Sequence, residues 1–218
     1  MLLSVVGFAQ ANVSNVDQIG LLNGALVVQV GSMNDSDVFQ IGAGNLAIVT
    51  QVGDSNESDT NQGGILNVAV VTQDGTTNDS YIGQAGLGNV AMTSQYGTSN
   101  NAVTGQLGFF NYASTEQIGN DNSASTLQFG FGNSSDTFQD GDFNSAATLQ
   151  VGWGNSATTS QEGIGNMSNT WQFGFDNTAD TNQWGWYNNA TTIQVGNDHM
   201  STISQVGFAN TAIVYQSN

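Results

Sequence analysis

The sequence contains no lysine and no arginine, whereas seventeen aspartate and glutamate residues give its 218 residues a formal net charge of −17. Because nucleic-acid binding depends on cationic side chains that neutralise phosphates, this composition excludes nucleic acid as a partner. The same charge would repel the chain from an anionic membrane surface. No apolar run reaches the roughly eighteen residues of a membrane-spanning helix, so we expect no membrane insertion.

Proline and cysteine are also absent, and histidine occurs once, as His199. Proline would interrupt any β-ladder that it entered, so its absence leaves the whole chain open to strand pairing. Without cysteine there are no disulfides. The many serine and threonine hydroxyls have no general base to activate them, and no second histidine accompanies His199. We therefore expect no enzymatic activity, no catalytic or metal-binding residue and no cofactor.

What the sequence does have is an eleven-residue repeat, marked most clearly by glutamine. The glutamine column consists of Gln18, Gln29, Gln40, Gln51, Gln62, Gln73, Gln84, Gln95, Gln106, Gln117, Gln128, Gln139, Gln150, Gln161, Gln172, Gln183, Gln194, Gln205 and Gln216. A fixed period of this kind indicates an array of stacked structural units.

Other positions keep the same step, so that the unit reads N-x-[AS]-x-[VIT]-x-Q-x-G-x-x. Asparagine stands six residues before each glutamine, except where His199 takes its place. Glycine stands two residues after each glutamine except the last, where Asn218 is found. The asparagine column consists of Asn12, Asn23, Asn34, Asn45, Asn56, Asn67, Asn78, Asn89, Asn100, Asn111, Asn122, Asn133, Asn144, Asn155, Asn166, Asn177, Asn188 and Asn210.

The fixed positions lie two residues apart, which places them on one face of an extended strand rather than on a helix. The Gly-x-x-Asn segment supplies a turn, since glycine and asparagine both tolerate the backbone angles of a tight reversal. A weaker 22-residue alternation indicates that two units form one rung. We therefore predict an all-β fold, a β-solenoid or cross-β stack of strand-turn-strand rungs, with nineteen half-repeats in residues 12–218.

The order of the inward residues predicts how the two strands of a rung face each other. Folded face to face and antiparallel, they place Asn opposite Gln, and the small residue opposite the β-branched one. Stacked side-chain amides then bond to their copies above and below, as in steric zippers. The interior can be polar because each buried amide has a partner. We assign the glutamine and asparagine columns as a self-assembly ladder.

Apart from Phe8, every aromatic residue lies at an outward or turn position of the unit. Several gather in register on one outer face, and an exposed apolar stripe of this length indicates a contact surface. We predict lateral contacts between copies through Phe129, Phe131, Trp153, Trp171, Phe173 and Phe175.

The acidic residues do not recur at one offset, as the ligands of a calcium-binding β-roll would. Asp37 and Asp59 share a column on adjacent rungs, as do Asp140 and Glu162, which leaves weak cation binding open as an alternative. The interpretation that we favour is that the acids, with glycines such as Gly63, make the strands less adhesive and slow premature assembly.

Residues 1–11 stand outside the repeat. They begin with an apolar stretch and end in Ala9-Gln10-Ala11, which is typical of a signal-peptidase site, but no basic segment precedes it. We interpret the segment as a signal-peptide remnant. The alternative is a degenerate leading strand, in which Val5 falls in the β-branched register.

Two stretches, QIGLLNGALVVQ from Gln18 to Gln29 and QIGAGNLAIVTQ from Gln40 to Gln51, resemble the curlin repeat of curli subunits. The resemblance covers residues 12–218, although this chain has more repeats than curli subunits usually have and lacks their Lys and Arg. It implies a bacterial functional amyloid that is secreted to the cell surface and polymerises into biofilm-matrix fibres that serve in cell adhesion. It also implies two partners besides the chain itself, a nucleator subunit and a secretion pore.

These features together predict a self-assembling extracellular fibre subunit that grows by templated end-to-end stacking of rungs. The final repeat is not basic, which favours a major fibre subunit over a nucleator. The alternative is a soluble, capped β-solenoid binding protein of the ice-binding or adhesin-like kind. Ice binding requires outward threonine arrays, whereas the repeated threonines here stand in the inward register.

Overall fold

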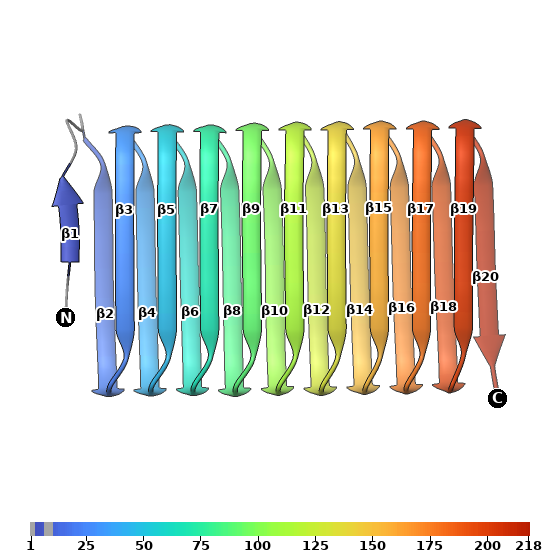
Figure 1. Ribbon diagram of the computed structural model, residues 1–218, viewed down its shortest axis with the longest axis horizontal. Helices are drawn as coiled ribbons and strands as arrows, with labels where there is room; N and C mark the ends of the chain where they lie inside the picture. The colour runs from blue at the N-terminus through green and yellow to red at the C-terminus, as the bar shows by residue number, and fades with distance from the viewer. Residues whose placement is uncertain (1–2, 7–10) are drawn as a thin grey trace.

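The computed structural model describes residues 3–6 and 11–218, and within these residues the chain forms twenty β-strands and no helix. The strands make two ten-stranded parallel sheets (Figure 1). Sheet A contains the odd-numbered strands from β1 to β19, and sheet B contains the even-numbered strands from β2 to β20. Successive strands alternate between the sheets and run in opposite directions. The predicted all-β stack of strand-turn-strand rungs is confirmed.

The strands have nearly uniform length. In sheet A they are β1 (Leu3–Val6), β3 (Gly24–Ser32), β5 (Leu46–Asp54), β7 (Val68–Thr76), β9 (Val90–Thr98), β11 (Tyr112–Asn120), β13 (Ser134–Asp142), β15 (Ser156–Ile164), β17 (Thr178–Trp186) and β19 (Met200–Phe208). In sheet B they are β2 (Val13–Leu21), β4 (Asp35–Ala43), β6 (Glu57–Ile65), β8 (Asp79–Leu87), β10 (Asn101–Phe109), β12 (Ser123–Phe131), β14 (Ser145–Trp153), β16 (Met167–Phe175), β18 (Asn189–Asn197) and β20 (Thr211–Ser217).

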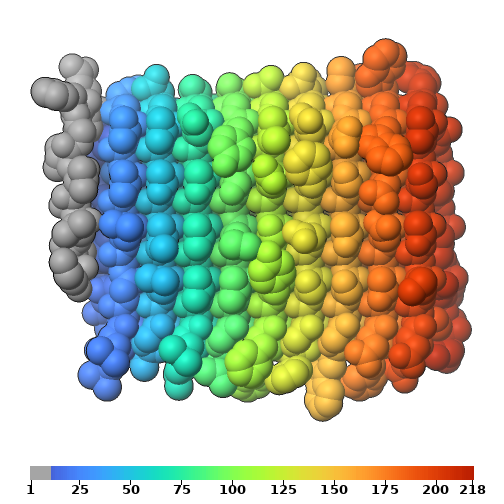
Figure 2. Space-filling model, viewed as in Figure 1, coloured from blue at the N-terminus to red at the C-terminus, as the bar shows by residue number. Residues whose placement is uncertain are grey.

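From β2 to β20 the rungs stack in register, because each residue pairs with its counterpart one rung further along. In sheet B, Ala102 lies beside Ala124 and Gln106 beside Gln128, in both cases 22 residues apart. Side chains of one kind consequently form rows along the long axis of the molecule, visible as aligned atoms across its face (Figure 2). The 22-residue rung inferred from the sequence is therefore present.

The turns differ from the prediction in one respect. The residue that adopts the left-handed conformation is not asparagine but the one before it, for example Leu66 at φ 57° and Thr77 at φ 54°. Asparagine acts through its side chain instead: Asn67 Nδ2 donates to the Gly63 carbonyl oxygen at 3.0 Å and so closes the turn. The prediction that asparagine adopts the unusual backbone angles of the turn is therefore wrong. The residue before it adopts them, and the asparagine amide bridges the turn.

The glycine that follows each glutamine by two residues is required by the stacking itself. Gly64 has φ +115°, and a Cβ built there would overlap the carbonyl oxygen of Gly86 in the next rung of sheet B. A left-handed φ is costly for residues with a side chain, and this close approach adds a steric clash. Any other residue at this position would push the rungs apart.

The interior between the sheets consists of the inward columns. Towards the N-terminal half it contains an apolar cluster that includes Ala47, Val49 and Val71. Further along, threonine takes the β-branched position, and the hydroxyl oxygen of Thr126 lies 3.5 Å from that of Ser135 in the facing sheet. The predicted pairing of small with β-branched residues is confirmed at this contact.

The N-terminal segment contributes one short strand. β1 pairs in parallel with β3, with Ser4 beside Val27 and Val5 beside Val28. The register is thus shifted by one residue from that of the other rungs, so the column suggested for Val5 as a leading strand is wrong. Residues 7–10, which hold Phe8 and part of the predicted cleavage site, lie outside the described residues, and removal of the segment stays a prediction.

Within residues 3–6 and 11–218 the structure contains no helix of the length and apolarity needed to cross a membrane.

Candidate functional site

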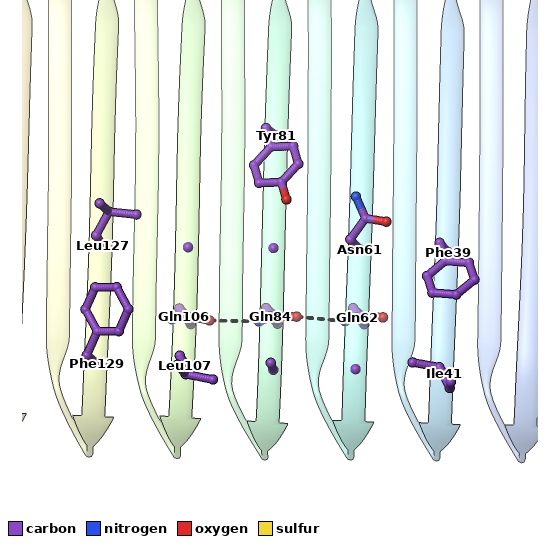
Figure 3. A pocket seen from close by; sticks show the side chains of 14 residues that line it. Phe39, Ile41, Asn61, Gln62, Tyr81, Gln84, Gln106, Leu107, Leu127 and Phe129 are labelled. Atoms are coloured by element: carbon purple, nitrogen blue, oxygen red, sulfur yellow. Dashed lines mark hydrogen bonds between the residues drawn. The ribbon is translucent and has the colours of Figure 1, made fainter.

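Buried glutamine side chains form one ladder in each sheet. In sheet B, Gln62 Nε2 donates to Gln84 Oε1, and Gln84 Nε2 donates to Gln106 Oε1, both at 2.8 Å (Figure 3). Every glutamine of the column from Gln18 to Gln194 donates to the glutamine of the next rung in the same way. The structure brings the whole glutamine column together, and its role in self-assembly stays a prediction.

Each glutamine amide from Gln29 to Gln216 also reaches a backbone carbonyl in the facing sheet. Gln84 Nε2 donates to the Val68 oxygen at 2.9 Å, and Gln117 Nε2 donates to the Asn101 oxygen at 3.0 Å. The amides bond to their copies on neighbouring rungs, as predicted, and Gln lies opposite Asn, since Gln51 Nε2 donates to the Asn56 carbonyl oxygen at 3.1 Å. No hydrogen bond joins a Gln side chain to an Asn side chain within the described residues. Most asparagine amides bridge their own turn, as Asn67 Nδ2 does, whereas the longer glutamine side chain reaches the main chain of the facing sheet.

The asparagine side chains form a second pair of ladders at the turns. Asn56 Nδ2 and the Asn56 backbone N–H both donate to Asn34 Oδ1 at 3.0 Å. Asn56 Nδ2 also donates to the Gly75 carbonyl oxygen at 3.1 Å, which ties the turn to the next rung. The side-chain contact recurs along the column from Asn34 to Asn188 and again at Asn210.

The two kinds of ladder point in opposite directions along the stack. Gln62 donates to the glutamine that follows it in the chain, whereas Asn56 donates to the asparagine that precedes it. On the side that faces the C-terminal end of the stack, its C-terminal side, each rung therefore presents glutamine donors and asparagine acceptors. On its N-terminal side it presents glutamine acceptors and asparagine donors. The eleven-residue pattern identifies the ladder residues but does not reveal this polarity, which follows from contacts of the amides with the main chain.

His199 interrupts the asparagine ladder. Its backbone N–H donates to Asn177 Oδ1 at 3.1 Å, as an asparagine in this column would. Its Nε2 lies 3.3 Å from the Val195 carbonyl oxygen, so the ring bridges the turn where an amide bridges the others. His199 therefore keeps the backbone hydrogen bond of the asparagine column. Within the described residues, its side chain makes no hydrogen bond to the Asn177 side chain.

The residues predicted to make lateral contacts belong to β12, β14 and β16 of sheet B. Trp153 is 61% exposed, and its ring packs edge to face on that of Phe175, with centroids 5.6 Å apart. The exposed members are Phe129, Phe131, Trp153, Trp171 and Phe175, and Phe173 is half-buried. The stripe faces solvent, and its use in bundling of fibres stays a prediction.

The N-terminal part of sheet B carries stacked carboxylates. Asp37 lies beside Asp59 on the next rung, and Glu57 lies between Asp35 and Asp79. Repulsion by the Asp79 carboxylate, followed by burial and the other acids, raises the pKa of Glu57. Burial and then Asp37 raise the pKa of Asp59. Within the described residues no three potential metal ligands lie close enough together to hold an ion.

Residues 174–207 of the chain match the Curlin associated repeat family. Comparison with curated proteins finds no significant match. The matched segment runs from β16 into β19 and includes Gln183, Gln194 and Gln205. The columns and hydrogen bonds of this segment continue through the other rungs, so one structural unit accounts for the stack from β2 to β20.

Proposed function

We propose that this protein is an extracellular structural subunit that polymerises end to end into amyloid fibres of a bacterial biofilm matrix. The observation that carries the proposal is that each rung is complementary to a copy of itself. Every interior interface from β2 to β20 joins Gln with Gln 22 positions apart, as Gln84 with Gln106, and all but the one at His199 join Asn with Asn, as Asn34 with Asn56. A rung of a second copy offers the same donors and acceptors as the next rung of the same chain.

The outer edges of β19 and β20 pair with no strand of the described chain. Unpaired strand edges are templates for the addition of further strands. Each ladder bond contributes about 0.5–1.5 kcal/mol net, and the backbone bonds of nine-residue strands such as β19 add to this. Docking of one rung on another therefore repeats, between molecules, an interface that the chain forms many times within itself.

The polarity of the ladders dictates how copies join. The C-terminal side of a rung presents glutamine donors, which find glutamine acceptors only on the N-terminal side of another rung. Two C-terminal sides placed together would bring the strands together antiparallel, so that the in-register Gln-to-Gln and Asn-to-Asn bonds of the stack could not form, and each buried amide left without a partner would cost about 1–3 kcal/mol. All subunits of a fibre should therefore point in one direction.

Secretion, a nucleator subunit and a secretion pore as partners, and adhesion within a matrix are parts of the same proposal. They are supported by the Curlin associated repeat at residues 174–207. We also propose the role of major fibre subunit rather than nucleator, because the final repeat is not basic. The proposed role is structural, and no catalytic step is assigned to any residue.

A soluble β-solenoid binding protein is the second candidate, and β1 is the observation that favours it. By pairing with β3, this strand covers part of one edge of sheet A. The threonines of the β-branched column, such as Thr104, are buried between the sheets and cannot form an ice-binding face. If β1 acts as a cap, the chain will remain monomeric.

Cysteine crosslinking tests the proposal, since the chain has no native cysteine. Asn15 in β2 and Ile213 in β20 occupy equivalent outward positions of their units. In-register neighbours in a sheet are about 4.8 Å apart, within the range that a disulfide spans. A mixture of N15C and I213C chains should yield a disulfide dimer after assembly, while each variant alone should not. T202C in β19 serves as the partner if β2 docks on sheet A. Disulfides of I213C with itself, or a chain that stays monomeric, would overturn the proposal.

A further inference from the structure

The two ends of the stack have strands whose inner faces are only partly covered. Nineteen strands run from β2 to β20, so sheet B extends one strand beyond sheet A at the C-terminal end, where β20 follows β19 (Figure 1). Gln18 of β2 is exposed and Gln216 of β20 is half-buried, whereas Gln117 in the same column is fully buried. A second copy that supplies a facing strand would complete the inner faces of β2 and β20.

A second copy can continue the stack in two ways. In the first, β2 pairs with β20, so that each sheet is continued by the same sheet of the next copy. β3 and β19 then lie two strand spacings apart, and only the four-residue strand β1 lies between them. In the second, the next copy is rotated by half a turn about the long axis, so that β2 pairs with β19 and β3 pairs with β20. This half-turn arrangement gives every strand at the junction an in-register neighbour and places β2 opposite the inner face of β20.

The outward residues of β19 and β2 favour the half-turn arrangement. Val206 and Phe208 are 69% and 65% exposed, and no strand of the described chain pairs with the outer edge of β19. Equivalent positions of the two strands carry residues of the same kind, in the pairs Ser204 with Asp17, Val206 with Ile19 and Phe208 with Leu21. Apolar residues are therefore buried against apolar residues, while the carboxylate keeps a polar neighbour.

The outward residues of β20 and β3 favour the same arrangement. Ile213 and Tyr215 are 71% and 65% exposed. In the half-turn arrangement their neighbours in the next copy are Leu26 and Val28. Pairing of β20 with β2 would instead place Tyr215 beside the Asp17 carboxylate. The apolar surface of β20 is therefore covered by apolar residues only when the two sheets exchange at the junction.

The edge of β3 that β20 requires carries β1. This strand covers only the four residues from Leu26 to Gln29, and its register is shifted by one residue from that of the stack. β20 offers seven residues in the register of the stack, with Gln216 in position to meet Gln29. A neighbouring copy therefore forms the longer and better matched pairing, and β20 replaces β1 on this edge.

We propose that successive copies in a fibre are related by half a turn about the fibre axis, with β2 on β19 and β3 on β20. The inference rests on the end-to-end polymerisation proposed above, and it specifies the surface through which one copy meets the next. Each copy advances the fibre by nineteen half-rungs, roughly 46 Å at a strand spacing of about 4.8 Å. The aromatic stripe that includes Trp153 consequently alternates between opposite faces of the fibre.

Cysteine crosslinking of full-length chains tests the half-turn. The four sites used are outward positions that are equivalent in β2, β3, β19 and β20, namely Asn15, Leu26, Thr202 and Ile213. Pairs of variants are mixed, assembled under reducing conditions and then oxidised. N15C should form a disulfide dimer with T202C, and L26C should form one with I213C, because in-register neighbours are about 4.8 Å apart. N15C with I213C, and L26C with T202C, are the matched controls and should yield no dimer.

A dimer of N15C with I213C, without one of N15C with T202C, would refute the half-turn and leave end-to-end polymerisation intact. Equal yields in all four mixtures would also refute it. Electron microscopy of fibres of the unaltered chain gives an independent measurement. Their helical symmetry should combine a rise of roughly 46 Å with a rotation near half a turn, and a rotation near zero would contradict the inference. A chain that forms no fibres would instead contradict the proposed function, and the half-turn with it.

Discussion

Gln84 donates from Nε2 to Gln106 Oε1 at 2.8 Å, and the same nitrogen donates to the Val68 carbonyl oxygen at 2.9 Å. One amide therefore joins two rungs of one sheet and also joins the two sheets. Buried amides without partners would destabilise the fold, whereas here each glutamine amide from Gln29 to Gln194 donates to two acceptors. The stack consequently tolerates a polar interior that contains few large apolar side chains.

Replacing Gln106 with Leu should strongly destabilise the folded chain. The change removes the acceptor for Gln84 and the donor to Gln128 Oε1 and to the Val90 oxygen. Each buried group left without a partner costs about 1–3 kcal/mol. Chemical denaturation monitored by circular dichroism would measure the loss.

The matched control is Thr104→Val, two residues earlier in the same strand. The Thr104 hydroxyl is buried without a hydrogen-bond partner among the described residues, and valine has nearly the same shape. This variant should be at least as stable as the unaltered chain. Equal loss in Gln106→Leu and Thr104→Val would show that the amide bonds are not what stabilises the interior.

Substitution by alanine should have opposite effects on stability at two adjacent glycines, Gly63 and Gly64. Gly64→Ala forces a side chain into a left-handed φ and against the Gly86 carbonyl, so we expect a loss of at least about 1–3 kcal/mol. The new methyl group of Gly63→Ala makes only ordinary contacts, with Ile41 and the Gln84 carbonyl oxygen, so this variant should be neutral or slightly stabilised. Melting temperatures of the two variants would separate the cases, and similar temperatures would contradict the rung geometry.

Stability should increase on acidification because of the stacked carboxylates in sheet B. The pKa of Glu57 and the pKa of Asp59 are raised in the folded state, so protons bind more tightly to folded than to unfolded chains. Their contribution is complete below the unfolded pKa values, 4.5 for Glu57 and 3.8 for Asp59, and is lost as pH rises through the raised values.

Glu57→Gln/Asp59→Asn should therefore be more stable than the unaltered chain at pH 7 and should show a flatter dependence of unfolding free energy on pH. Glu116→Gln on sheet A removes one charge away from this cluster and serves as the control. If the double variant keeps the full pH dependence, the carboxylate row is not its source.

Replacing Trp153, Trp171 and Phe175 with Ser should leave fibre growth nearly unchanged, because these side chains face outward. The variant should instead form thinner, less bundled fibres, since the exposed apolar stripe is removed. Growth kinetics and fibre width by electron microscopy should be recorded together. Replacing Gln194, Gln205 and Gln216 with Leu is the converse experiment, and it should slow growth while width is kept. Arrested growth in the aromatic variant would contradict the assignment of inner and outer faces.

The period of the sequence was enough to predict the fold and the inward columns. Fixed residue types stand two positions apart and recur every eleven residues, and strands stacked in register are the simplest structure that accounts for both spacings. The partners of the glutamines were not predictable in full. Whether Gln84 meets an asparagine or the Val68 oxygen depends on the path of the turn, where Leu66 rather than Asn67 takes the left-handed conformation. A hollow on the outer face of sheet B, lined by Gly63, Gly83 and Gly105, was not predicted either, since it arises from neighbouring rungs rather than from the repeat unit itself.

The measurement that bears most directly on the proposed assembly is X-ray diffraction from the purified chain after incubation in dilute buffer with salt. Repetition of one rung interface within and between molecules predicts fibres with a sharp meridional reflection at about 4.8 Å, the strand spacing along the stack. Sedimentation of the same sample should show depletion of monomer. A chain that remains monomeric at high concentration for days, without fibres or this reflection, would contradict the account and favour a capped solenoid.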